Sequence, residues 1–427
     1  MGVREASAQG IEDLQLFAPA NLSSYGGGPQ PNEGYFFNFD WLGWSIPRPA
    51  ASPVGFPNLT RTVYYNTDIV RVQHNTHDTS GFKDEYQNGQ RVEFGRVEGS
   101  SGWLFSTYRF PTTNQTIHAT GMDIVFQDIA FGSGGSRFLE GWTANFVGGD
   151  GSATSYEDFE IQNLPLSFDE VEIHNRVNTY SLEMMYLKRL RPFHHGGNLE
   201  LFFGVRYMQF DDQFDVDARG VDRFTYLDGE GGTPAGDDDD DDDAGGGTTQ
   251  GTIVTGPRSI LGDSDWHTKA HNRIVGPQIG ARWFKKKNRW TLSAEGRFFA
   301  GYNQQTIRQH GMLGSQLDDG TPYSFEAGTV PGLPYIPLYM DPVSFEHREF
   351  KGEWSPAAEL RLQATYQITR AFSVRAGWTG FWMDGIARGS SMIDYTLRET
   401  QIMGINMDNN RQEIFTHGLN VGVEFNR

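Results

Sequence analysis

The sequence predicts an all-β protein, a single transmembrane antiparallel up-and-down β-barrel of about 10–12 strands with long extracellular loops. Several segments alternate strictly between apolar and polar residues, which is typical of strands with one face toward lipid and the other toward a lumen. Short turns and long loops alternate along the chain, as they do in such barrels. No stretch approaches about 18 consecutive apolar residues, so no transmembrane helix is expected.

The clearest hairpin is the segment 273–302, whose two halves flank the basic turn Lys285–Asn288. Its second half, read with a period of two, places large apolar residues on one face and polar residues such as Glu295 on the other. The aromatic residues Trp290 and Tyr302 stand at the two ends of the apolar face. This arrangement is expected where that face crosses a bilayer and its ends reach the two interfaces.

The same pattern predicts ten antiparallel strands in all. In chain order they are residues 34–45, 91–97, 102–110, 170–188, 198–210, 273–284, 290–302, 358–367, 372–383 and 416–425. A further hairpin within residues 111–168, where short β-like pieces occur, would raise the number to twelve. Both numbers are even, as bacterial barrels require.

The connections predict the domain organisation. Residues 1–33 are expected to be an N-terminal extension, in which Ala6-Ser7-Ala8 resembles a signal-peptide remnant and the rest is a periplasmic or lumen segment. Residues 34–427 are expected to form the barrel, with large loops near 46–89, 111–168, 211–265, 303–349 and 386–413. In such barrels the short turns face the periplasm and the long loops face outward, so both termini are expected in the periplasm.

Composition excludes several classes of function. The formal net charge is −19, so a nucleic acid is not expected as a partner. The chain has no Cys, which excludes disulfides, thiolate metal sites and cysteine catalysis. Its mean hydropathy of −0.52 agrees with a membrane barrel, because barrel strands carry apolar residues only at every second position and polar loops dilute them.

Several segments resemble a known family. They are LFAPANL at 16–22, YGGG at 25–28, NEGYFF at 32–37, and LELFFGVRY at 199–207 with the acidic pair that follows it. They resemble the putative outer-membrane β-barrel porin family of planctomycetes, and with the end of the chain the resemblance covers most of the length. Segment 419–425 is also similar to an outer-membrane insertion signal, although its aromatic residue is third from the end. The resemblance implies the barrel fold, and the porin activity that it implies rests on architecture.

The inward faces of the clearest strands carry five acidic and five basic residues. They are Glu183, Glu200, Glu295, Glu359 and Glu424, and Arg206, Arg282, Arg297, Arg361 and Arg375. Two interpretations are open: a constriction whose charges select ions, or a salt-bridged plug that holds a narrow barrel shut. Ten to twelve strands enclose a narrow lumen that long Arg side chains can fill, which favours the plug or a very narrow pore.

The loops contain weaker candidates for chemistry. One acidic run supplies the oxygen ligands that Ca²⁺ prefers, although like charges between Gly-rich flanks usually form a solvated loop. The run is Asp237, Asp238, Asp239, Asp240, Asp241, Asp242 and Asp243. His267 and His271 fall at the outer rim of a strand with no dedicated nucleophile nearby, and His194-His195 lies in a turn. We therefore expect no enzyme, and no cofactor except Ca²⁺ in the acidic loops.

Two functions follow from the sequence. The first is a narrow porin-like passive channel for small solutes or ions in the bacterial outer membrane. The second is a closed structural barrel whose acidic outer loops mediate surface packing, adhesion or assembly. The expected partners are the lipid bilayer and, through the outer loops, neighbouring barrels or other envelope proteins.

Overall fold

The protein is described by a computed structural model that covers most of the chain. The described residues are 33–56, 60–65, 68–73, 75–128, 145–147, 153–155, 163–193, 197–220, 224–228, 252–256, 263–314, 343–398 and 401–426. The expected N-terminal extension up to residue 32, the Asp237–Asp243 run and His194-His195 therefore lie outside the described residues.

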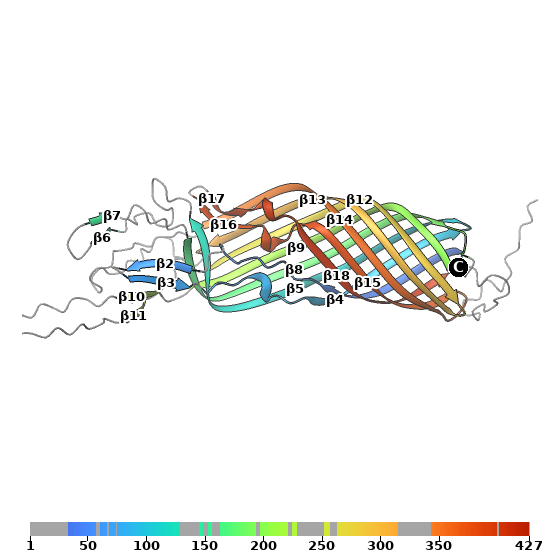
Figure 1. The fold of residues 1–427 in the computed structure, drawn as a ribbon, viewed down its shortest axis with the longest axis horizontal. Helices are drawn as coiled ribbons and strands as arrows, with labels where there is room; N and C mark the ends of the chain where they lie inside the picture. The colour runs from blue at the N-terminus through green and yellow to red at the C-terminus, as the bar shows by residue number, and fades with distance from the viewer. Residues whose placement is uncertain are drawn as a thin grey trace, which may run out of the picture.

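Ten long strands form one closed antiparallel barrel (Figure 1). They are β1 (Gly34–Ile46), β4 (Glu85–Glu98), β5 (Ser101–Asp128), β8 (Asn163–Arg189), β9 (Gly197–Gly220), β12 (Ser264–Lys287), β13 (Trp290–Leu313), β14 (Val343–Gln367), β15 (Phe372–Ile386) and β18 (Gln412–Asn426). Each strand pairs with the next one along the chain, and β18 pairs with β1 to close the barrel. The predicted fold class is confirmed, with ten strands in the barrel.

Short elements lie in the long connections (Figure 1). The strands are β2 (Thr60–Tyr65), β3 (Asp68–Gln73), β6 (Asn145–Val147), β7 (Ala153–Ser155), β10 (Phe224–Asp228), β11 (Thr252–Gly256), β16 (Ile393–Arg398) and β17 (Gln401–Ile405), and the 3₁₀ turns are η2 (Thr79–Gly81), η3 (Gly389–Ser391) and η4 (Met407–Asn409). Within the described residues, no helix is long and apolar enough to cross a membrane.

Six strands, β5, β8, β9, β12, β13 and β14, are 24 to 28 residues long, whereas the other four have 13 to 15 residues. These six continue into segments that the sequence predicts as loops. For example, β5 continues to Asp128 and β9 to Gly220. The barrel wall therefore extends well past the four shorter strands on the long-loop side (Figure 1).

The hydrophobic alternation reverses its phase where the wall leaves the lipid-facing region. In the first half of β9, Phe203 and Val205 point outward and are exposed, whereas in its second half Phe214 and Val216 are buried inside the barrel. The outward positions of the second half are occupied by acidic residues such as Asp217. Apolar residues face lipid in the first part and a packed core in the second, because the outside is then water.

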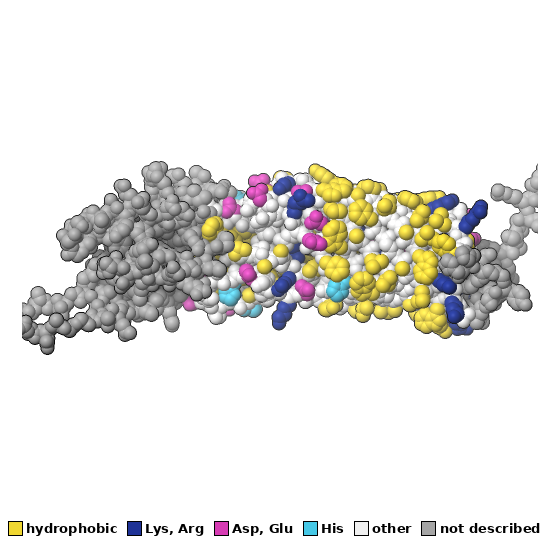
Figure 2. Space-filling view, in the orientation of Figure 1, with side chains coloured by type: hydrophobic (Ala, Val, Ile, Leu, Met, Phe, Trp, Pro, Cys, Tyr) yellow, Lys and Arg dark blue, Asp and Glu magenta, His cyan; other side chains and the backbone are white. Residues whose placement is uncertain are grey.

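A belt of exposed apolar side chains surrounds the half of the barrel that carries the short turns (Figure 2). On β13 it runs from Trp290 to Tyr302, and Tyr302 is paired with the equally exposed Trp354 of β14. We call this belt the apolar band. Aromatic residues at both of its ends agree with the predicted lipid contact.

The outer half of the barrel is filled by an apolar core. Its members come from the wall and from the connections that fold inward, and include Val54, Phe82, Phe126, Phe168, Phe214, Trp266, Tyr395 and Met403. Trp266, Phe126 and Tyr395 pack edge to face with ring centroids 5.9 to 6.1 Å apart. This core explains why the extended wall remains folded without lipid around it.

Candidate functional site: the charged layer and the plug of the lumen

All ten charged residues predicted to line the lumen face the interior of the barrel. Eight of them are buried, and Arg282 and Glu424, near the short turns, are partly exposed. The alternation that places apolar residues toward lipid places every second residue of the same strands in the lumen. The residues therefore come from different strands but meet in one layer, which we call the charged layer.

Arg297 lies at the centre of the charged layer. Its guanidinium donates hydrogen bonds to Glu295 (2.5 Å) and to Glu183, and its second amino group lies 3.8 Å from Glu93. Arg361 is held in the same way, by Glu359 of its own strand (2.5 Å) and by Glu93 of β4 (2.6 Å). These contacts join strands on opposite sides of the lumen.

Aromatic rings cover the end of the charged layer that faces the long loops. Arg206 donates hydrogen bonds to Glu359 (3.1 Å) and to the Tyr108 hydroxyl (3.1 Å). The guanidinium also lies over the ring of Phe381, 4.9 Å from its centroid, which is within cation–π distance. An apolar layer that includes Phe110, Phe210, Trp44 and Leu42 follows on this side.

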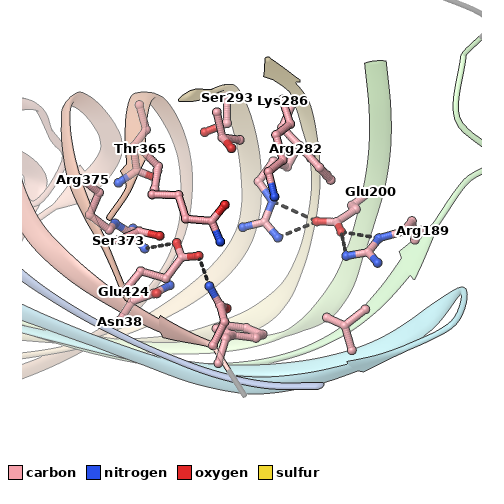
Figure 3. Close-up of a pocket in the computed structure, with 17 residues that line it drawn as sticks. Asn38, Arg189, Glu200, Arg282, Lys286, Ser293, Thr365, Ser373, Arg375 and Glu424 are labelled. Atoms are coloured by element: carbon pink, nitrogen blue, oxygen red, sulfur yellow. Dashed lines mark hydrogen bonds and ion pairs between the residues drawn. The ribbon is translucent and has the colours of Figure 1, made fainter. Parts of the chain in front are cut away.

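The other end of the charged layer borders a cavity near the short turns (Figure 3). The cavity has a volume of about 120 Å³ and is lined mostly by polar side chains, among them Lys286 and Ser293. On its wall Glu200 accepts hydrogen bonds from Arg189 and Arg282, both at 2.9 Å. Arg375 lies 3.8 Å from Glu424 on the same wall.

Four further residues complete the charged layer, and the sequence-based prediction missed them. Arg91 pairs with Asp40 (2.9 Å), Glu93 contacts three arginines, and Arg189 binds Glu200. With them the layer has seven acidic residues, Asp40, Glu93, Glu183, Glu200, Glu295, Glu359 and Glu424, and seven basic ones, Arg91, Arg189, Arg206, Arg282, Arg297, Arg361 and Arg375. The same alternation in β1 and β4 would have found Asp40, Arg91 and Glu93.

The equal numbers of charges make the layer electrically balanced. Each guanidinium has at least one carboxylate oxygen within 4 Å, and most of these side chains are less than 10% exposed. Burial removes the hydration of an ion at a cost of several kcal/mol, which only a close partner offsets. The layer can therefore stay packed and largely dry across the lumen.

A second closure lies on the long-loop side of the charged layer, where the connection between β15 and β18 folds into the barrel. Asp212 of the wall accepts hydrogen bonds from the Arg388 guanidinium (2.9 Å) and the Gly389 backbone (2.7 Å). The side-chain amides of Asn272 and Gln305 donate to the carbonyl oxygens of Ala387 (2.8 Å) and Asn410 (3.0 Å). We call the described residues 387–398 and 401–411 the plug.

The wall's inward polar residues thus fix the backbone of the plug. Arg388 of the plug also donates a hydrogen bond to the Pro47 carbonyl (3.0 Å), which joins it to the connection after β1. At the far end of the plug, β16 pairs with the outer end of β5. The plug therefore occupies the space inside the outer wall.

His267 and His271 face the outside of the wall, beyond the apolar band. The Nδ1 atom of His267 lies 2.9 Å from a carboxylate oxygen of Asp215, and that of His271 lies 2.9 Å from Asp211. The hydrogen bond with Asp215 raises the pKa of His267 above its usual value, although partial burial acts against it. In the part of the chain that the structure describes, no three His, Cys, Asp or Glu side chains are placed to hold a metal ion.

Comparison with known proteins agrees with this architecture. Residues 248–426 match the family model described as "Putative beta barrel porin-7". This match confirms the predicted resemblance to a barrel porin family over that part of the chain. The curated proteins contain no match.

Similar solved structures are distant in sequence. The outer membrane protease OmpT from Escherichia coli is 8% identical, with a TM-score of 0.35 and with 95% of this chain and 100% of that chain covered. The Pseudomonas putida toluene transporter TodX is 7% identical, with a TM-score of 0.20 and coverages of 93% and 90%. The outer membrane channel DcaP of Acinetobacter baumannii is 8% identical, with a TM-score of 0.16 and coverages of 95% and 100%.

Likenesses this distant assign no activity. The ten-stranded closed barrel, its apolar band and the family match together identify the chain as an outer-membrane-type β-barrel whose residues 248–426 match the family of putative beta barrel porin-7 proteins.

Proposed function

We propose that the protein is a closed β-barrel of the bacterial outer membrane that holds its long outer loops at the cell surface. The observation that carries this proposal is the charged layer, in which seven acidic and seven basic side chains pair across the lumen. In this function the barrel is an anchor, and the acidic loops bind neighbouring barrels or other envelope proteins.

Passage of an ion through the charged layer would require its side chains to separate. Arg206 and Glu183 are each 1% exposed, so little water is available to hydrate either side chain once it separates from its partners. Separating such a pair leaves two desolvated charges, each of which costs several kcal/mol. The apolar layer beyond Arg206 adds a second barrier, because apolar constrictions exclude water.

A narrow passive channel for small solutes or ions is the second candidate. It is supported by the polar cavity of about 120 Å³ near the short turns, which reaches the Glu200–Arg282 pair. In that function the fixed charges of the layer would select the permeant ions. The family description, which names a porin, is consistent with this candidate.

We propose no catalytic role. His267 and His271 pair with carboxylates on the outside of the wall, so they contribute nothing to the cavity near the short turns. Ca²⁺ binding by the Asp237–Asp243 run stays a prediction from the sequence.

Conductance of the purified full chain in planar bilayers tests the proposal. A closed barrel should give a stable baseline at all potentials that the bilayer tolerates. An open porin reconstituted in the same way serves as the positive control. Reproducible unitary current steps, with ion selectivity that changes in an Arg361→Gln variant, would contradict the closed barrel and support the channel.

A further inference from the structure

A row of three basic side chains crosses the outer surface of the wall beyond the apolar band. Lys269 of β12 lies directly opposite Arg308 of β13, and Arg308 lies directly opposite Arg348 of β14. All three point away from the lumen, and both arginines are exposed. Like charges directly opposite each other on neighbouring strands destabilise a sheet, so this row calls for a counter-charge.

The described part of the chain provides little counter-charge to the row. Neither Arg308 nor Arg348 forms an ion pair with a described carboxylate, and Arg348 instead lies over the Phe350 ring at 4.5 Å. The charge of Lys269 helps to lower the pKa of Asp211 on the neighbouring strand. Elsewhere on the same surface basic groups are paired, as Arg176 is with Asp215 at 3.2 Å.

The height of the basic row above the bilayer limits which anionic molecule can supply its counter-charge. The apolar band ends at the cross-strand row of Val275, Tyr302 and Trp354. Arg308 is six residues beyond Tyr302 on β13. With a rise of about 3.4 Å per residue and a strand tilt of about 40°, the basic row lies roughly 15 Å above the edge of the hydrocarbon.

A fourth basic residue lies lower on the same surface. Arg273 is exposed and stands two residues beyond Val275 on β12, which corresponds to roughly 5 Å above the hydrocarbon edge. Between the two heights lies Phe350, an apolar side chain that is 63% exposed. The surface therefore offers positive charge at two levels with an apolar contact between them.

We propose that this surface binds a phosphorylated glycolipid of the outer leaflet, with phosphate groups on both its lipid-anchoring sugars and its core sugars. Arg273 is at the height of the anchoring phosphates, and the row of Lys269, Arg308 and Arg348 is at the height of phosphates on the core. The guanidinium group binds phosphate oxygens in a bidentate manner, and the exposed Phe350 provides an apolar face for a sugar ring. A glycerophospholipid reaches only the lower level.

The test compares an Arg308→Gln, Arg348→Gln double variant with the wild-type chain. Lipopolysaccharide with a phosphorylated core is added to the purified protein, and its dissociation constant is measured by native mass spectrometry. We expect about tenfold weaker binding by the double variant, equivalent to about 1.4 kcal/mol. A Lys285→Gln, Lys287→Gln variant, which removes two exposed charges at the opposite end of the barrel, should bind as the wild type does.

Three results would overturn the proposal. The first is equal binding of the same glycolipid after chemical removal of its core phosphates. The second is equal occupancy by phosphatidylglycerol or by inorganic phosphate. The third is a lower unfolding temperature of the double variant without glycolipid, since the acidic outer loops would then be the counter-charge. The proposal expects an unchanged or higher unfolding temperature, because the repulsion between like charges is removed.

Discussion

Arg297 shows how strongly single residues depend on pairing in the lumen. It contacts Glu183, Glu295 and Glu93, and all four side chains are buried. We expect Arg297→Ala to lower the free energy of unfolding by about 3–5 kcal/mol, because it leaves buried carboxylates without their partner. Urea unfolding in detergent micelles measures the change, and conductance should stay near zero.

The exposed Lys285, near the short-turn end of β12, provides the control for this experiment, since its replacement by Ala should change the stability very little. In an open, hydrated pore a charge pair contributes only about 0–1 kcal/mol. A stable Arg297→Ala protein with cation-selective conductance would therefore show that the charged layer is a channel lining.

The pair of His267 and Asp215 makes the stability of the outer wall depend on pH. Burial alone would raise the pKa of Asp215, but hydrogen bonds from His267 and Gln213 outweigh it and lower that pKa. The pKa of His267 is raised by the same hydrogen bond. The contribution of Asp215 to stability is therefore lost as pH falls through its lowered pKa, and that of His267 is lost as pH rises through its raised pKa.

We expect Asp215→Asn to return the pKa of His267 toward the usual value of about 6.5. The stability difference between the wild type and this variant should be largest between the two shifted pKa values, at about pH 5–6. NMR titration of the imidazole signals in micelles measures the first effect. An unchanged His267 titration in the variant would contradict the assigned partner.

Among the elements, β13 and β14 define how deep the barrel sits in lipid. The outward positions of β13 run from Trp290 to Tyr302, so the middle of the apolar band lies near Gly296 and its neighbour Leu360 on β14. Leu292, at 56% exposed, lies only one outward position from Trp290. Leu360, rather than Leu292, is therefore the residue that tests the midplane.

We expect Leu360→Arg to lower the free energy of unfolding from a bilayer by about 2–4 kcal/mol, and Leu292→Arg to lower it by about 0–1 kcal/mol. Thr291→Arg is the inward control, and it should be tolerated because Thr291 lines the cavity near the short turns. Equilibrium unfolding from lipid vesicles measures all three variants. Equal costs at Leu360 and Leu292 would contradict the depth assigned to the apolar band.

At the scale of the whole molecule, the orientation in the membrane follows from the long and short connections. Asp408 is exposed at the long-loop end, and Lys287 is exposed at the end of β12, next to a short turn. A cysteine at position 408 should react with a membrane-impermeant maleimide on intact cells, and one at position 287 should react only after lysis. Because the chain has no Cys, each variant reports one site. Labelling of Lys287→Cys at the same rate on intact cells would reverse the orientation.

How much of this structure the sequence predicts depends on how clearly apolar and polar residues alternate in each region. The ten strands and the inward charges on β8, β9, β12, β13, β14, β15 and β18 follow from period-two alternation, which is a local property. The sequence predicts loops at the outer extensions of β5, β9 and β13. In these extensions the apolar residues change from the outward to the inward face, and the lipid-facing pattern therefore ends as it would at the end of a strand. Asp40, Arg91 and Glu93 lie on β1 and β4, which alternate in the same way, but the prediction of inward charges covers only the clearest strands.

By itself, the sequence determined the transmembrane barrel, the even number of strands and the inward side of ten charges, because alternation and turn chemistry are local. Only the tertiary structure decided which charges meet, since Arg361 and Glu93 are 268 positions apart and pair across the lumen. It also placed the plug inside the barrel, where Asp212 and Asn272 bind backbone that no local pattern marks. Closure depends on contacts between distant segments, and such contacts leave no period in the sequence.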